Sequence, residues 1–123
     1  MKPVLFIDFD GTLCHDRFWR SLDSELKPRV QEVLFGTEDN LVRDWMRGKY
    51  TSEQINRIAA DTLNIEYDLL WNTFVKDCES MFVEQDTLDK INKLRNHHAL
   101  ILMTDNMDSF SRFTVPALKL ERY

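Results

Sequence analysis

The sequence predicts an α/β protein in which two neighbouring strands of a parallel sheet are separated along the chain by a long helical insert. Two apolar runs, Val4 to Ile7 and Ala99 to Met103, have the composition of strands buried on both faces. The segment between the runs is far longer than a crossover helix needs, and its apolar residues recur with helical spacing. An inserted subdomain is the economical explanation.

The length and composition fit one globular domain. The chain has 123 residues, of which 43% are hydrophobic and 30% charged, and its formal net charge is −5. This balance excludes a disordered chain and gives no electrostatic reason to expect nucleic acid or an anionic membrane as a partner. Cys14 and Cys78 lack the spacing of a zinc or redox motif, and the first residues do not resemble a signal peptide. We therefore expect a cytoplasmic protein with free thiols.

The insert is predicted to be helical. Leu22 to Leu34 has helical spacing, with Pro28 either starting or kinking the helix, and a second helix over Asn40 to Arg47 should stop at Gly48. Thr51 and Gln54 form a capping box for a third helix. A fourth helix should bury one stripe of residues, namely Tyr67, Leu70, Trp71, Phe74, Cys78 and Phe82.

One further helix should lead into the second strand. Asp86 is a plausible N-cap for it, and Leu88, Ile91 and Leu94 recur at the spacing of an inward face. A right-handed crossover through this helix would bring the second strand beside the first.

Acidic residues follow the first strand directly. Asp8 and Asp10, with Gly11 and Thr12 after them, lie at the carboxyl end of the strand, where open α/β sheets bind ligands. One carboxylate can attack phosphorus, and the other can protonate the leaving oxygen and then activate water. Because two carboxylates repel phosphate, a divalent cation is needed, and Mg²⁺ suits oxygen ligands. The simpler alternative is that Asp10 and Gly11 only form a turn, which Asp8 caps.

Thr104 follows the second strand and would lie near Asp8 if the two strands are adjacent. Its hydroxyl and nearby backbone N–H groups could hold phosphate oxygens, although a threonine at a strand end is more often a turn or cap residue. His15, Arg17 and Arg20 could also contact substrate, but exposed surface positions are the simpler interpretation.

The run from Asp8 to Leu13 resembles the first signature motif of the haloacid dehalogenase (HAD) superfamily, and Leu100 to Thr104 resembles the second. Trp45 to Glu53 is loosely similar to the cap region of its phosphoglycolate-phosphatase-like branch. This resemblance implies an α/β, HAD-like Rossmannoid core with parallel strands, made of residues 1–15 and 85–123. Residues 16–84 would be an inserted helical cap.

The resemblance also implies roles for single residues. Asp8 would be the nucleophile and a Mg²⁺ ligand, and Asp10 would be the general acid/base, with its backbone carbonyl on the metal. The phosphate-binding residues would be Thr104, Asp105, Gly11 and Thr12. The implied activity is Mg²⁺-dependent hydrolysis of a small phosphorylated metabolite through an aspartyl-phosphate, with a phosphomutase using the same acids left open.

Two later motifs of such enzymes, a lysine and an acidic pair, are not visible after Thr104, and Lys119 follows too closely to be that lysine. We therefore expect that later core strands are missing from this chain and that its activity is impaired. Because an unpaired strand at the edge of a sheet can pair with another chain, a homo-oligomer is a further alternative. The alternative is a degenerate, non-catalytic HAD-like domain that serves as a binding or dimerising module.

Overall fold

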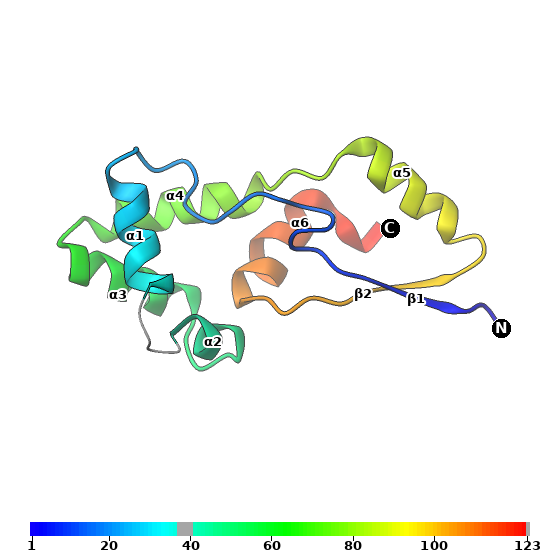
Figure 1. Ribbon diagram of the computed structural model, residues 1–123, viewed down its shortest axis with the longest axis horizontal. Coiled ribbons are helices and arrows are strands. Elements are labelled where there is room, and N and C mark those ends of the chain that lie inside the picture. Colours follow the sequence, from blue (N-terminus) through cyan, green and yellow to red (C-terminus); the bar gives the residue numbers. More distant parts are fainter. Residues whose placement is uncertain (37–40, 123) are drawn as a thin grey trace.

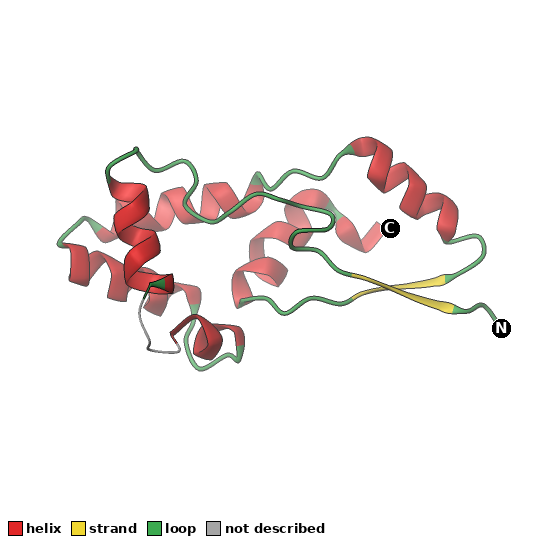
Figure 2. Ribbon diagram, viewed as in Figure 1, coloured by secondary structure: helices red, strands yellow, loops and turns green. Residues whose placement is uncertain are grey.

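The computed structural model describes residues 1–36 and 41–122. Helices α1 to α4 gather at one end of an elongated molecule, and the two strands lie with α5 at the other end (Figures 1 and 2). In chain order the elements are β1 (Val4–Ile7), α1 (Leu26–Phe35), α2 (Leu41–Met46), α3 (Ser52–Leu63), α4 (Tyr67–Glu79), α5 (Gln85–Leu94), β2 (Ala99–Leu102), the π-helix η1 (Phe110–Thr114), α6 (Val115–Leu118) and the 3₁₀-helix η2 (Leu120–Arg122).

The predicted pairing of the strands is confirmed. β1 and β2 are parallel neighbours, in a register that pairs Val4 with Ala99 and Ile7 with Leu102. β2 ends at Leu102, one residue before the predicted end. The carboxyl ends of both strands point toward the helical end of the molecule (Figure 1). The loops that follow the two strands therefore begin side by side.

The prediction that the strands are buried on both faces is wrong. Ile7 and Leu100 face the helices and line a small cavity together with Ile91 of α5. On the opposite face Val4 and Phe6 are 52% and 56% exposed. The reason is that, in the described part of the chain, helices cover only one face of the sheet. β1 therefore has a period-two pattern of burial, although both its faces are apolar.

The first helix begins later than predicted, and the second ends one residue earlier. α1 begins at Leu26, whose N–H donates to the Asp23 carboxylate at 2.8 Å, while the N-cap residue itself, Glu25, makes no side-chain capping bond. Pro28 then lies in the first turn, where its missing N–H costs no intrahelical bond. The predicted start of the second helix, Asn40, lies outside the described residues. α2 ends at Met46, and Gly48, with φ +81°, supplies the left-handed turn that follows.

The capping box of Thr51 and Gln54 is confirmed at the start of α3. Three details of the later helices are wrong. Phe82 lies beyond the end of α4 and is 65% exposed, and Leu94 is also exposed. Asp86 lies inside the first turn of α5, whose N-cap position is occupied by Glu84 without a side-chain capping bond.

The helical end has its own apolar core, centred on aromatic rings. Trp19 and Trp45 are buried with ring centroids 6.1 Å apart, and Phe74 stacks obliquely 4.8 Å from Trp19. The indole N–H of Trp19 donates to Asn56 at 3.1 Å, which satisfies the polar atom at the centre of this core. A second, smaller core beneath the strand ends contains Phe9, Cys14, Met81, Val83 and Leu88.

Helix length and hydropathy give no candidate for a membrane-spanning helix anywhere in the described ranges.

Candidate active site

The sheet register brings the two polar loops together. Beyond the last strand pair, the Met103 N–H donates to the Ile7 carbonyl at 2.8 Å, so the ladder continues to the point where Asp8 begins. Thr104 is the next residue on the second strand's side. The Asp8 carboxylate accepts a hydrogen bond from the N–H of the following residue, Phe9, at 2.8 Å. Asp8 is exposed at the carboxyl end of the sheet.

A tight turn holds Asp10 in place. The Phe9 carbonyl accepts hydrogen bonds from the N–H groups of Thr12, Leu13 and Cys14 at 2.9–3.2 Å, and Gly11 has the positive φ (+75°) that this path requires. The Gly11 N–H donates to the Cys14 carbonyl at 2.8 Å. The N–H groups of Gly11 and Thr12 are thus both used inside the turn. Phosphate binding by these residues, which stays a prediction, would fall to the Thr12 hydroxyl.

Asn106 connects the two loops. Its amide nitrogen donates to the Asp10 carboxylate at 2.8 Å and lies 3.5 Å from the Thr104 hydroxyl oxygen. Its amide oxygen accepts from the Met107 N–H at 3.0 Å, which fixes the orientation of the amide. Asp10 and Thr104 are therefore close to the same group. Sequence reasoning missed Asn106, although it belongs to the polar run Thr104 to Asn106 that ends the strand.

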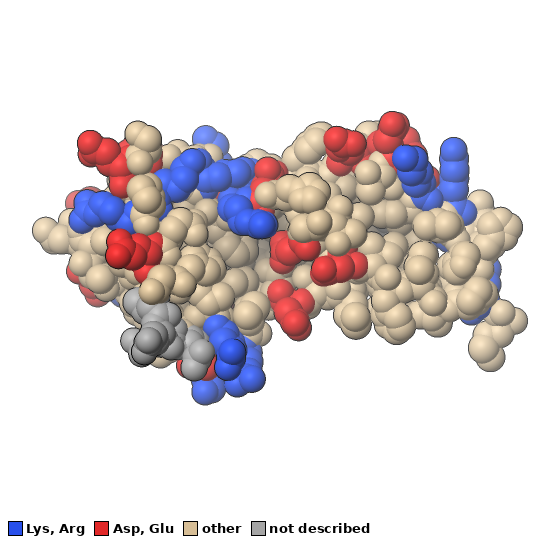
Figure 3. All heavy atoms as spheres, in the orientation of Figure 1, with Lys and Arg blue, Asp and Glu red and all other residues tan. Residues whose placement is uncertain are grey.

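A cleft of about 210 Å³ opens beside Asp10. Asp10 and Asp105 line it from the strand ends, and Arg17, Phe35 and Met46 line it from the helical end. Arg17, treated as a surface residue in the simpler interpretation, thus borders the same cavity as Asp10. His15 is exposed. Figure 3 shows acidic side chains gathered near the middle of the molecule, where the two ends meet.

The local environment makes the Asp10 carboxyl easier to protonate than an ordinary aspartate. Although the residue is exposed, partial desolvation of its carboxyl raises the pKa of Asp10. The Arg17 guanidinium opposes this effect, and the neighbouring Asp8 carboxylate adds to it. A carboxyl whose pKa is raised retains its proton at higher pH, which is what a general acid requires.

The donor atoms at this site are limited but suited to Mg²⁺. Within residues 1–36 and 41–122, no three His, Cys, Asp or Glu side chains gather closely enough to hold a metal ion. Mg²⁺, however, is usually held by one or two carboxylates and keeps several waters, with substrate phosphate completing its shell. The Asp8 carboxylate and the backbone carbonyl of Asp10 would fit that pattern.

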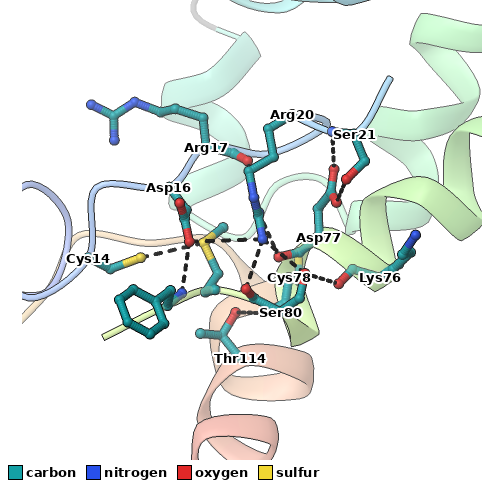
Figure 4. A network of polar contacts seen from close by, with 12 residues as sticks. Cys14, Asp16, Arg17, Arg20, Ser21, Lys76, Asp77, Cys78, Ser80 and Thr114 are labelled. Carbon is teal, nitrogen blue, oxygen red and sulfur yellow. Dashed lines mark hydrogen bonds and ion pairs between the residues drawn. The ribbon is translucent and has the colours of Figure 1, made fainter. Parts of the chain in front are cut away.

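Two segments between the ends of the molecule are fastened to each other (Figure 4). The Arg20 guanidinium donates to the carbonyls of Asp77 and Ser80, each at 2.9 Å. The buried Asp77 carboxylate accepts from both the N–H and the hydroxyl of Ser21, and Asp16 accepts from the Phe82 N–H at 2.8 Å. Arg20 is therefore engaged in structural contacts between residues 16–21 and 77–82.

The loop after β2 is also tied to the helices. The Asp108 carboxylate accepts from the Trp45 indole N–H at 3.0 Å and from the Ser52 N–H and hydroxyl at 3.1 and 2.5 Å. Arg112 donates to it at 2.8 Å. Burial alone would raise the pKa of Asp108, but these hydrogen bonds outweigh it and hold the pKa below its usual value. Asp108 thus fixes α2 and the start of α3 against the loop that carries Thr104 and Asn106.

Comparison with solved structures identifies the class of fold. The chain is similar to a HAD family enzyme, BT-2542, from Bacteroides thetaiotaomicron, solved in complex with magnesium and inorganic phosphate. The TM-score is 0.63 and the identity 16%, over 94% of this chain and 59% of that chain. A magnesium complex of the same enzyme gives a TM-score of 0.62 at 16% identity, over 94% and 58% of the two chains.

The chain therefore has an α/β, HAD-like fold in which a helical cap accompanies a core with a parallel sheet. It spans about three fifths of the length of the solved structures that it matches (59%). No family model and no curated protein matches the sequence.

Proposed function

We propose that the chain belongs to a Mg²⁺-dependent phosphatase-type hydrolase of the HAD superfamily, acting on a small phosphorylated metabolite. The observation that carries the proposal is the contact of Asn106 with Asp10 beside Thr104, at the carboxyl ends of adjacent parallel strands. The similar enzyme from B. thetaiotaomicron was solved with magnesium and inorganic phosphate, which supports the same chemistry here.

In the proposed mechanism, a carboxylate oxygen of Asp8 attacks phosphorus, and an Asp8–phosphate bond forms as the bond to the leaving oxygen breaks. Asp10 gives its proton to that oxygen, and its raised pKa suits this step. Asp10 then takes a proton from water, which attacks the aspartyl-phosphate and releases phosphate. A bound Mg²⁺, held by the Asp8 carboxylate and the backbone carbonyl of Asp10, would neutralise charge on the phosphate. The hydroxyls of Thr104 and Thr12, with the backbone N–H of Asp105, would hold the phosphate oxygens.

The finer assignments belong to the same proposal. Residues 16–84 would form the cap and residues 1–15 and 85–123 the core, with the boundaries at the segments that Arg20 and Asp77 fasten together. The Trp45 to Glu53 region supports the phosphoglycolate-phosphatase-like branch. The two buried thiols, neither in a disulfide, support a cytoplasmic location.

The test compares Asp8→Asn and Asp10→Asn with the unaltered protein, in the longest expressible form, on p-nitrophenyl phosphate and Mg²⁺. Asp8→Asn should abolish turnover and leave no aspartyl-phosphate detectable by mass spectrometry after acid quenching. Asp10→Asn should slow turnover about 10²–10⁴-fold. Asp61→Asn, an exposed position on α3, is the matched control. Unchanged turnover in Asp8→Asn would refute the proposal.

The exposed apolar face of the sheet favours a second candidate, a non-catalytic module that pairs with itself or with a partner. Val4, Phe6 and Met103, the last 61% exposed, lie where a packed sheet would be covered. Sedimentation would show a stable dimer, and calorimetry would show no Mg²⁺ binding. A monomer that binds Mg²⁺ would exclude this candidate.

A further inference from the structure

Asn106 holds one oxygen of the Asp10 carboxyl. Its side-chain nitrogen donates to Oδ2 of Asp10 at 2.8 Å. The orientation of the amide follows from its other atom, because the Met107 N–H donates to the amide oxygen at 3.0 Å. An amide NH₂ group has no acceptor to offer that N–H, so the nitrogen is the atom that points toward Asp10. Oδ2 of Asp10 is therefore an acceptor.

The same amide nitrogen also borders the proposed phosphate position. It lies 3.5 Å from the Thr104 hydroxyl oxygen, at the outer limit of a hydrogen bond. One nitrogen is thus close both to the carboxyl that would act as the general acid and to the hydroxyl that would bind the phosphate. The placement of the acid relative to the phosphate therefore depends on where Asn106 is held.

Asn106 belongs to an anchored segment of the chain. The next residue, Met107, is 9% exposed and packs in the core of the helical end. Asp108, one residue further on, accepts three hydrogen bonds from the helical end. Asp10, by contrast, is an exposed residue on the turn after β1. The anchored amide therefore restricts the carboxyl, and the reverse is not the case.

The contact decides which oxygen of Asp10 carries the proton. The carbonyl oxygen of a protonated carboxyl accepts a hydrogen bond more readily than its hydroxyl oxygen, which already carries the proton. With Asn106 donating to Oδ2, the carbonyl is at Oδ2 and the O–H is at Oδ1. After the proton has left, Oδ2 keeps the same bond. The amide therefore needs no reorientation during the reaction, which is the property of a preorganised group.

We infer that Asn106 is a positioning residue for the general acid, and that it holds Oδ2 of Asp10 so that Oδ1 delivers the proton to the leaving oxygen. This inference rests on the proposed function for the role of Asp10. As the bond between phosphorus and the leaving oxygen breaks, the O–H bond at Oδ1 breaks as well, and its proton passes to that oxygen. Asp10 becomes a carboxylate, and Asn106 makes and breaks no covalent bond.

Two substrates that differ in their need for a proton test this role. In the proposed mechanism kcat/KM covers the reaction up to the loss of the leaving group. Ethoxide requires a proton as it leaves, whereas p-nitrophenolate is stable without one. In the longest expressible form with Mg²⁺, Asn106→Ala should lower kcat/KM for ethyl phosphate about ten-fold or more. For p-nitrophenyl phosphate, kcat/KM should change less than about three-fold.

Three further variants separate positioning from phosphate binding and from general damage. Asp10→Asn should discriminate between the two esters in the same direction, with a larger loss on ethyl phosphate. Thr104→Ala should lower kcat/KM for both esters about equally, because both carry the same phosphate. Asn72→Ala, at an exposed position on α4, should leave both unchanged. Equal losses on the two esters in Asn106→Ala, or no loss on either, overturn the inference.

A measurement on the unaltered protein needs neither catalysis nor a folded Asn106 variant. In isotope-labelled protein, the side-chain N–H resonances of Asn106 report its hydrogen bond to Asp10 directly. Asp10→Ala removes the acceptor and should move these resonances upfield. Asp61→Ala, which removes an exposed carboxylate from α3, should leave them in place. Resonances that do not move in Asp10→Ala overturn the inference.

These outcomes separate the two proposals. If Asp8→Asn leaves hydrolysis unchanged, the proposed function fails, and the amide resonances still show whether Asn106 holds the Asp10 carboxyl. If Asp8→Asn abolishes hydrolysis but Asn106→Ala treats the two esters as the unaltered protein does, only the inference about Asn106 fails.

Discussion

Replacing Asp108 with alanine should destabilise the protein by about 3 kcal/mol. The change leaves three donors without their acceptor, namely the Trp45 indole N–H and the N–H and hydroxyl of Ser52, and both residues are at most 1% exposed. An unsatisfied buried donor costs about 1–3 kcal/mol. Because the Asp108 side chain is itself 30% exposed and water can enter, the lower value applies to each donor. The Arg112 contact at the surface adds little.

Urea denaturation followed by tryptophan fluorescence measures this loss, and the midpoint of thermal unfolding should fall by about 10 °C. Asp108→Asn keeps one acceptor oxygen and should lose less than Asp108→Ala. Asp61→Ala, which removes an exposed carboxylate from α3, should change the free energy of unfolding by less than about 0.5 kcal/mol. If Asp108→Ala were as stable as Asp61→Ala, the bonds from Trp45 and Ser52 would not anchor α2.

The same residue predicts a pH dependence. The pKa of Asp108 is lower in the folded protein than the ordinary value of about 3.9 expected when unfolded. Its contribution is therefore fully present above about pH 4 and is lost as the pH falls through the folded-state pKa. Between about pH 5 and pH 3 the unaltered protein should lose more stability than Asp108→Asn does. Parallel curves would show that Asp108 has the same pKa in both states.

Three further predictions concern the neighbourhood of the site. Arg17→Gln removes the charge that lowers the pKa of Asp10, so the alkaline limb of kcat/KM should move to higher pH. Arg20→Gln should reduce the free energy of unfolding by about 1–2 kcal/mol, because its guanidinium bonds to the segment at Asp77 would be lost. Burial raises the pKa of the Cys78 thiol to about 12 and also raises that of Cys14, so neither should react with a disulfide reagent at pH 8 before unfolding.

Each of these has a result that contradicts it. If the alkaline limb stays in place in Arg17→Gln, the Arg17 guanidinium does not lower the pKa of the group that titrates there. Arg20→Gln is compared with Arg29→Gln, a change at an exposed position of α1. Equal unfolding midpoints for the two variants would show that the Arg20 hydrogen bonds do not stabilise the fold. Rapid labelling of either thiol in the native protein would show that the core at Cys14 or the helix at Cys78 opens readily.

The two strands and the helical insert could be predicted because they depend on local patterns, and the pairing of the strands follows from the right-handed crossover between them. Continuous apolar runs at Val4 and Ala99, and the capping box at Thr51, each indicate one structure. What covers a strand is not local, and the same run at Val4 to Ile7 is compatible with one or two buried faces. The exposure of Phe6 was therefore mispredicted.

The site was predicted in part, for a similar physical reason. Asp8, Asp10 and Thr104 are marked by their positions at strand ends, and adjacent strands place such residues together. The roles assigned to them, and to Asp105, Gly11 and Thr12, stay predictions. Asn106 and Asp108 could not be identified, because each acts through a partner distant in sequence. In the sequence, an asparagine and an aspartate at these positions indicate only polar loop residues, because their partners depend on the path of the loop.

The segment from Thr104 to Asp108 has two roles. Thr104 and Asn106 lie at the proposed phosphate position, and Asp108 accepts hydrogen bonds from Trp45 and Ser52. An anion bound at Thr104 should therefore also restrict the motion of Asp108. Ligand binding should therefore slow amide hydrogen exchange at the start of α3, where Ser52 bonds to Asp108. The same short segment of backbone would then control both ligand recognition and the rigidity of the cap.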